Sequence, residues 1–295
     1  MTATAVLAAL TAAAGWWAPA RLERAAWTLR APRAAAALWC ALLGFCATAL
    51  AMGLHQALTG GHGSGWLLGP LTGTPGPYRA EGLAGHTEAF ALAALVLGVA
   101  GGVAAAGCAR AARARARHRR LLDLVARPDA DGTLLVEDPR PAAWCVPGRG
   151  GRIVLTRGAA VALTDRQRAA VIAHERAHLA GRHHLLVAGV RALGRPLAWL
   201  PLARAAARRV PVLCEMAADD AAVRSVGRDA VARALCRVAA HPAPEGTLAA
   251  GAEAALERVR RLTHPRTALS APARTACWIA VATLPVLPLL IGCGP

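Results

Sequence analysis

Three residues of the segment "HERAH", residues 174–178, have the types and spacing of a metal-dependent hydrolase. His174 and His178 are four residues apart, so on a helix they lie one turn apart on one face and can bind one Zn²⁺. Glu175 lies about 100° around that helix, within reach of a water molecule on the metal. Zinc lowers the pKa of such a water to about 7, and the carboxylate can accept its proton. The motif therefore predicts zinc-dependent hydrolysis, typically of peptide bonds.

A catalytic zinc needs a third protein ligand and an open fourth position. The segment "CEMAADDAA" supplies Glu215, which we expect to be that ligand, and Asp219 one helical turn later. A carboxylate at this spacing suits a hydrogen bond to a ligating histidine, which fixes the tautomer of the imidazole. His183 and His184 are alternative ligands, but on the helix of His178 they would point away from the metal or lie too far along the axis. We expect them to be solvated or to support a ligand.

The surrounding sequence predicts a small α+β domain. Thr164 and Gln167 form a capping box, so the zinc-binding helix is expected to begin there. Short β-branched runs at residues 133–138 and 152–156 predict strands, and residues 142–148 are a further candidate. We expect a peptide substrate to pair with the edge of the sheet at residues 152–156. Residues 185–213 are apolar but interrupted by arginine and proline, which indicates helices lying against the domain or the membrane surface.

The composition indicates a membrane protein. Of the 295 residues 56% are hydrophobic, above the roughly 45–50% of soluble domains. Spanning a bilayer takes about 20 apolar residues. Four stretches are long enough: residues 2–20, 34–58, 89–109 and 276–294.

Arginine sets the expected orientation, since all 34 basic residues are arginine and the net charge is +17. The arginines gather between the first two spans and after the third, whereas the loop at residues 59–88 has only Arg79. The positive-inside rule then puts both termini outside the cell and residues 121–274 in the cytoplasm. Tyr78, the only tyrosine, falls in the external loop. The donor that stabilises the oxyanion therefore stays open between Arg224 and His241.

Other classes of protein fit the sequence less well. The eight cysteines form no C-x-x-C pair, which excludes a zinc ribbon and a thioredoxin-like site and implies no disulfide framework. Direct nucleic-acid binding is not expected, because the arginines follow the membrane flanks and only 4% of residues are aromatic. A non-catalytic signalling or zinc-sensing module is an alternative. Glu175 counts against it, since a binding site alone has no use for a base.

"HERAH" followed by the E-x-x-x-D of "EMAAD", between a third and a fourth apolar span, resembles the BlaR/MecR family of membrane antirepressor metallopeptidases. "AWCVPGRGGRIVLTRGAAVALTDRQRAAVIAHERAH" is similar to the core of that family, in which a short strand precedes the zinc helix. The resemblance implies the zinc ligands His174, His178 and Glu215, with Glu175 as base, in a cytoplasmic site. It also implies a protein substrate, by analogy a winged-helix transcriptional repressor of the BlaI/MecI type.

The chain departs from that family in one respect. Founding members carry a penicillin-binding sensor with an S-x-x-K serine, and this motif is impossible in a chain without lysine. We therefore expect no direct β-lactam acylation by this chain. The second enzyme hypothesis is membrane-protein quality control, as in the HtpX and CaaX-processing peptidases that share E-x-x-x-D.

Together these patterns predict a mainly α membrane protein in the plasma membrane. Four transmembrane helices carry a cytoplasmic α+β gluzincin-type metallopeptidase domain inserted between helices three and four. The expected divisions are residues 1–120 for helices one to three, 121–274 for the peptidase domain, and 275–295 for helix four and a short external C-terminus. The expected activity is that of a zinc endopeptidase that cleaves a cytoplasmic protein in signal-responsive derepression.

Overall fold

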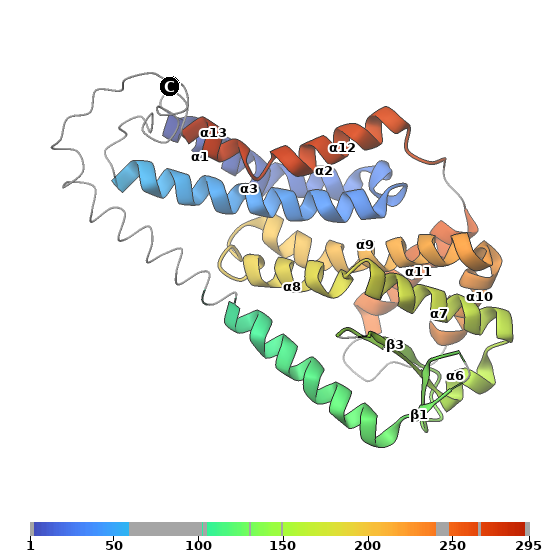
Figure 1. Cartoon of the computed structure of the whole chain (residues 1–295). Coiled ribbons are helices and arrows are strands. Elements are labelled where there is room, and N and C mark those ends of the chain that lie inside the picture. Colours follow the sequence, from blue (N-terminus) through green and yellow to red (C-terminus); the bar gives the residue numbers. More distant parts are fainter. Residues whose placement is uncertain are drawn as a thin grey trace.

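The computed structural model describes residues 3–58, 102, 105–129, 131–148, 150–239, 248–264 and 267–292. The chain forms two stacked helical layers with a small sheet below them (Figure 1). A mainly helical fold with a small sheet is what the sequence predicts. Most of the expected third span, residues 89–109, lies outside the described residues, as does the loop that contains Tyr78.

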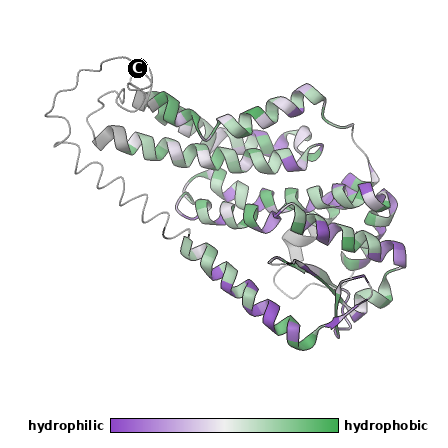
Figure 2. Cartoon of the chain, in the orientation of Figure 1, coloured by the Kyte–Doolittle hydropathy of each residue, from purple (hydrophilic) through white to green (hydrophobic). Residues whose placement is uncertain are grey.

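The first layer contains the N-terminal and C-terminal helices, with α3 at its centre. α3 packs against α1, α12 and α13, and green, hydrophobic residues dominate this layer (Figure 2). Its elements are α1 (Ala3–Ala12), the π-helical η1 (Ala13–Trp17), α2 (Ala18–Arg24), the 3₁₀ turn η2 (Ala26–Leu29), α3 (Pro32–Leu58), α12 (Ala271–Thr283) and α13 (Leu287–Gly292).

Among the described residues, one helix is long and apolar enough to cross a membrane, namely Pro32–Leu54 within α3. Its mean hydropathy is 2.0, and half of it is buried inside the protein. The expected fourth span is not one helix, because a turn at residues 284–286 separates α12 from α13. Pro285 lies in this turn, and proline has no N–H to continue a helical ladder. The four-span arrangement therefore stays a prediction.

The second layer is built around the long helix α9 (Pro201–Val226). Its first half packs with α8 (His183–Gly194) against α3, through a core that includes Trp39, Leu43 and Leu202. Its second half packs against α7 (Asp165–Ala180) and α10 (Arg228–Ala239), and α11 (Leu248–Thr263) lies beside both α9 and α10. The expected helices at residues 185–213 are thus α8 and the beginning of α9.

The sheet has four short strands in the order β1-β2-β4-β3. They are β1 (Arg127–Pro128), β2 (Leu134–Val136), β3 (Ala143–Val146) and β4 (Arg152–Thr156). β4 pairs with β2 in parallel and with β3 antiparallel, so it is an inner strand. The expectation that a substrate pairs with residues 152–156 is therefore wrong. The free edge that lies next to α7 is β3.

Local interactions set where α7 begins. The Thr156 hydroxyl accepts a hydrogen bond from the N–H of Ala159 and so caps the short helix α6 (Arg157–Ala162). Gly158 is required in this turn, because a Cβ there would lie 2.1 Å from the carbonyl oxygen of Pro139. The predicted capping box of Thr164 and Gln167 is confirmed, with both of its hydrogen bonds present. It satisfies backbone donors at the first turn of α7 and fixes that end of the helix.

Candidate metal centre and active site

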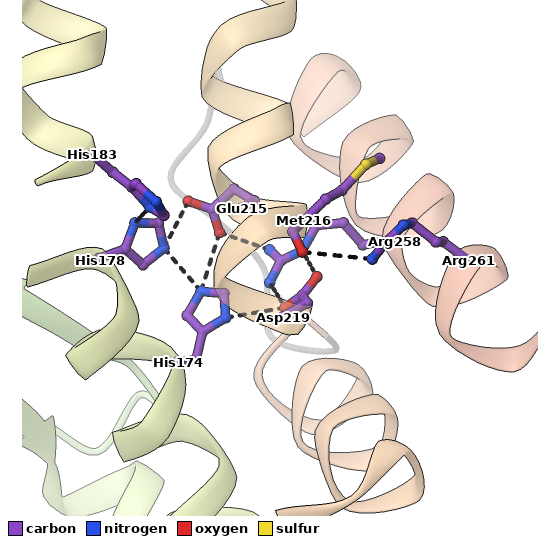
Figure 3. Close-up of polar contacts among 8 residues, drawn as sticks. All are labelled: His174, His178, His183, Glu215, Met216, Asp219, Arg258 and Arg261. Carbon is purple, nitrogen blue, oxygen red and sulfur yellow. Dashed lines mark hydrogen bonds and ion pairs between the residues drawn. The ribbon is translucent and has the colours of Figure 1, made fainter. Parts of the chain in front are cut away.

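His174 and His178 lie on the face of α7 that meets α9, where Glu215 faces them (Figure 3). The two Nε2 atoms are 3.0 Å apart. Glu215 Oε2 lies 3.3 Å from Nε2 of His174, and its Oε1 lies 3.3 Å from Nε2 of His178. The structure thus brings the three expected ligands together, with their ligand atoms within 4.8 Å of one another.

These distances fit a zinc ion. Ligand atoms bound at about 2.1 Å on a tetrahedral metal lie about 3.4 Å from one another. The separations here are 3.0 Å between the imidazoles and 3.3 Å from each imidazole to a different oxygen of Glu215, all close to that value. Two imidazoles and one carboxylate are also a donor set found at catalytic zinc sites that keep a fourth position open. The cluster could therefore hold zinc with little rearrangement.

Asp219 supports the first histidine, in the position that the sequence predicts. Its Oδ1 lies 3.0 Å from Nδ1 of His174, which leaves Nε2 of that ring directed at Glu215. Burial lowers the pKa of His174, but hydrogen bonds to Asp219 and Glu215 outweigh it and raise the pKa to about 9 in the metal-free protein. A metal at this site would have to displace that proton, so its binding would release one.

Arg258 on α11 is the residue that the sequence analysis missed. Its Nε and Nη2 donate to the two carboxylate oxygens of Asp219 at 2.8 and 2.7 Å. Its Nη1 lies 2.9 Å from Oε2 of Glu215. Among 34 arginines the sequence offers one weak signal, because Arg258 precedes the buried Leu262 by one turn and so shares its apolar face.

The charges of this cluster hold both carboxylates in the ionised form. Burial raises the pKa of Glu215, but hydrogen bonds to both histidines and the charge of Arg258 hold it well below its usual range. The same balance applies to Asp219, whose pKa is lowered by Arg258 and His174 against the effect of burial. Glu215 is therefore available as an anionic ligand without prior loss of a proton.

His183 supports the second histidine. Its Nδ1 lies 2.9 Å from Nδ1 of His178, and only 8% of His183 is exposed. Burial and the neighbouring His178 lower the pKa of His183 to about 4, so its neutral ring can accept a hydrogen bond from Nδ1–H of His178. His183 is therefore not a third ligand, and His184 is not part of the cluster.

The backbone conformation after α7 brings His183 next to His178. Arg182 adopts the left-handed conformation, with φ 49° and ψ 37°, which turns the chain back at the start of α8. A Cβ at Gly181 would lie 2.5 Å from Nε2 of His183, so glycine leaves the space that the imidazole occupies. A non-glycine residue in this conformation costs on the order of 1–3 kcal/mol. This unfavourable conformation of Arg182 is present at the point where the chain places His183 beside His178.

Glu175 lines one cavity together with His174, Glu215 and Ala143 of the edge strand β3. Cys145, also on β3, has its thiol close enough to Glu175 to be affected by the charge of that carboxylate. Burial, followed by the charge of Glu175, raises the pKa of this thiol to about 12, so it stays protonated. Of the two expected oxyanion donors, Arg224 does not line this cavity, and His241 lies outside the described residues.

The contact between Asp219 and His174 predicts a loss of zinc affinity in Asp219→Ala. We expect affinity to fall about 10- to 100-fold, as is typical when the partner of a ligating histidine is removed. Competition with a chromogenic chelator measures the change. Asp220→Ala is the matched control, since Asp220 pairs with Arg261 and does not contact His174. Equal losses in both variants would contradict the proposed role of Asp219.

The contact between His183 and His178 predicts a second loss of affinity. His183→Ala should bind zinc about 10-fold more weakly, because His178 loses the partner that orients its ring. His183→Asp, which restores an acceptor, should recover part of the loss. His184→Ala is the control. Unchanged zinc affinity in a folded His183→Ala variant would show that this contact does not orient the ligand.

Comparison with known proteins agrees with this geometry. Residues 109–212 match the model of peptidase family M48. The match contains His174, Glu175 and His178 and ends at residue 212, just before Glu215. No curated protein and no solved structure matches the chain. Peptidases of family M48 are zinc-dependent, so the match supports a metallopeptidase domain in this part of the chain.

Proposed function

We propose that this protein is a zinc-dependent endopeptidase whose metal is held by His174, His178 and Glu215. The observation that carries the proposal is the shared cavity, in which Glu175 lies beside the ligand cluster. A site that only binds or senses zinc does not need a carboxylate there. The match to family M48 supports the same activity.

Each side chain has a defined task in this reaction. Zinc, when bound, supplies a Lewis acid that polarises the peptide carbonyl and acidifies the attacking water. Glu175 accepts the proton of that water and returns it to the leaving amine. Asp219 and His183 keep the two imidazoles oriented. Arg258 balances the charge of the two carboxylates on α9.

The edge strand β3 supports an extended substrate. Among the residues that the structure describes, its one neighbour in the sheet is β4, and its first residue, Ala143, lines the cavity with Glu175. A peptide paired with the free edge of β3 through main-chain hydrogen bonds would therefore run past the base and the ligand cluster.

For the substrate we propose a cytoplasmic protein, and by analogy a winged-helix transcriptional repressor. The support is the resemblance to the BlaR/MecR family, carried by "HERAH" and "EMAAD". Membrane-protein quality control is the second candidate, because the E-x-x-x-D spacing, here Glu215 and Asp219 at the metal centre, supports it equally.

We also propose that the chain lies in the plasma membrane with its peptidase domain in the cytoplasm and both termini outside. The apolar stretches and the distribution of arginine support this arrangement, and so does the apolar helix Pro32–Leu54. α1 and α3 run in opposite directions, and α13 ends at the same end of the layer as α3 (Figure 1). This direction of the helices is compatible with termini on one side.

Glu175→Gln tests the peptidase activity. In detergent-purified full-length protein we expect one zinc per chain in the wild type and in the variant, because Glu175 is not a ligand. Cleavage of a co-expressed repressor, of casein or of the chain itself should fall by about 10²- to 10⁴-fold, the usual contribution of a general base.

The matched control is Glu253→Gln, which removes an exposed carboxylate on α11. If the wild type and Glu175→Gln both contain zinc but cleave equally little, a zinc-sensing module is favoured. If neither contains zinc, the proposal is wrong. If casein is cleaved but the repressor is not, and deletion of the gene for this protein leaves transcription unchanged, the repressor is not the substrate. The peptidase activity would still stand.

Cys236 tests the topology, since it is exposed on α10 in the domain that we place in the cytoplasm. A membrane-impermeant maleimide should label it in inside-out vesicles and not in intact cells, as mapped by mass spectrometry. Ser64→Cys, in the loop expected outside, is the matched control and should show the reverse pattern. Labelling of Cys236 in intact cells would overturn the orientation.

A further inference from the structure

The cavity that contains Glu175 extends from the metal centre to an apolar wall on α10. Its volume is about 190 Å³. Part of its lining consists of the polar residues of the metal centre. The rest consists mainly of aliphatic side chains from α7 and α10, namely Ala170, Val171, Val231, Ala234, Leu235 and Val238.

The sequence of α10 explains the apolar wall. Val231, Ala234, Leu235 and Val238 follow one another at intervals of three, one and three residues, which places them on one face of the helix. α10 packs against α7 through this face. The exposed Cys236 and Arg237 lie on other faces of the same helix. The cavity is therefore bounded by the side of α10 that faces the metal centre.

Two of the residues that line this space are small and buried. Ala170, one turn before His174 on α7, is 1% exposed, and Ala234 on α10 is 3% exposed. A larger aliphatic residue at either position would extend into the cavity. An apolar cavity of about 150 Å³ can hold a benzene molecule. The space beside the metal centre is thus large enough for one aliphatic or aromatic side chain.

The charge of the cavity favours an apolar occupant. Arg258 is the cation in its lining, but its Nε and Nη2 bind Asp219 and its Nη1 binds Glu215. Each nitrogen of this guanidinium already has a carboxylate partner, so its charge is balanced before a substrate side chain enters. The carboxylates of the lining, Glu175, Glu215 and Asp219, belong to the metal centre. A basic side chain against the aliphatic residues would therefore leave water without an anion directly beside it, which is costly.

We propose that this cavity is the specificity pocket of the enzyme, and that it binds an apolar side chain of the substrate next to the scissile bond. The class comprises Leu, Ile, Val, Met and Phe. The inference rests on the proposed peptidase function, because the cavity can act as a substrate pocket only if His174 and Glu175, which also line it, carry out peptide hydrolysis.

The test uses the full-length zinc-loaded protein and an equimolar mixture of peptides derived from a digested proteome. Sequencing of both new termini by mass spectrometry identifies the residues on each side of the cleaved bonds. We expect the apolar class to be enriched about 10-fold or more at one of the two positions, because one or two methylenes in an apolar pocket discriminate by that amount. Enrichment of charged residues or glycine at both positions would overturn the proposal.

Two variants change the pocket in opposite directions. Ala234→Leu should narrow it and lower cleavage beside Leu and Phe about 10-fold relative to cleavage beside Ala. Leu235→Ala should widen it and shift the preference towards Phe. It removes side-chain volume without adding any, so it provides the test if Ala234→Leu fails to fold. The matched control is Cys236→Leu, which adds bulk on the exposed side of α10 and should leave the preference unchanged.

Failure of the pocket and failure of the peptidase function give different results. Cleavage that requires Glu175 and zinc but keeps its preference in both Ala234→Leu and Leu235→Ala would overturn the pocket alone. A mixture that Glu175→Gln cuts as fast as the wild type would overturn the peptidase function and the pocket with it.

Discussion

Asp219 brings a carboxylate into the interior with 1% of its side chain exposed, and an unpaired charge there would cost several kcal/mol. Arg258 pairs with both of its oxygens, and His174 is hydrogen-bonded to one of them. Three helices, α7, α9 and α11, are therefore held together at one carboxylate. The candidate ligands His174 and Glu215 take their positions from the contacts around this carboxylate.

α9 connects this contact to the apolar layer. Leu213 and Met216 are fully buried in the core that α9 shares with Trp39 and Leu43 of α3. Glu215 lies in the same turn of α9, and its side chain points towards His174 and His178. A shift of α9 relative to α3 would therefore move Glu215, the candidate third ligand. Arg261 adds a second connection, because it pairs with Asp220 on α9 and donates to the carbonyl oxygen of Leu29 in η2.

The sequence predicts those parts of the site that depend on contacts within one element. Two histidines four residues apart share a face of any helix, and the same spacing relates Glu215 to Asp219. Arg258 could not be found in this way, because its partner lies 39 residues away on another helix. His183 stayed ambiguous because its position depends on the left-handed conformation of Arg182.

The same limit applies to the fold. β2 and β4 lie where β-branched runs predict strands, and β3 lies in the further candidate segment, but the order of the strands is not a local property. β4 became an inner strand because β2 and β3 pair on its two sides, which moved the free edge to β3. The expected fourth span has the composition of a transmembrane helix, yet a turn containing Pro285 divides it, since apolar composition alone does not guarantee a continuous helix.

The absence of lysine also bears on the metal centre. A guanidinium presents its donors in one plane and in fixed directions, so Arg258 can bind Asp219 through two nitrogens and Glu215 through the third. A lysine ammonium is a single point charge on a flexible stem and could not hold both carboxylates in a fixed relation. Because the position of Glu215 relative to the two imidazoles sets the ligand geometry, arginine is the basic residue that this site requires.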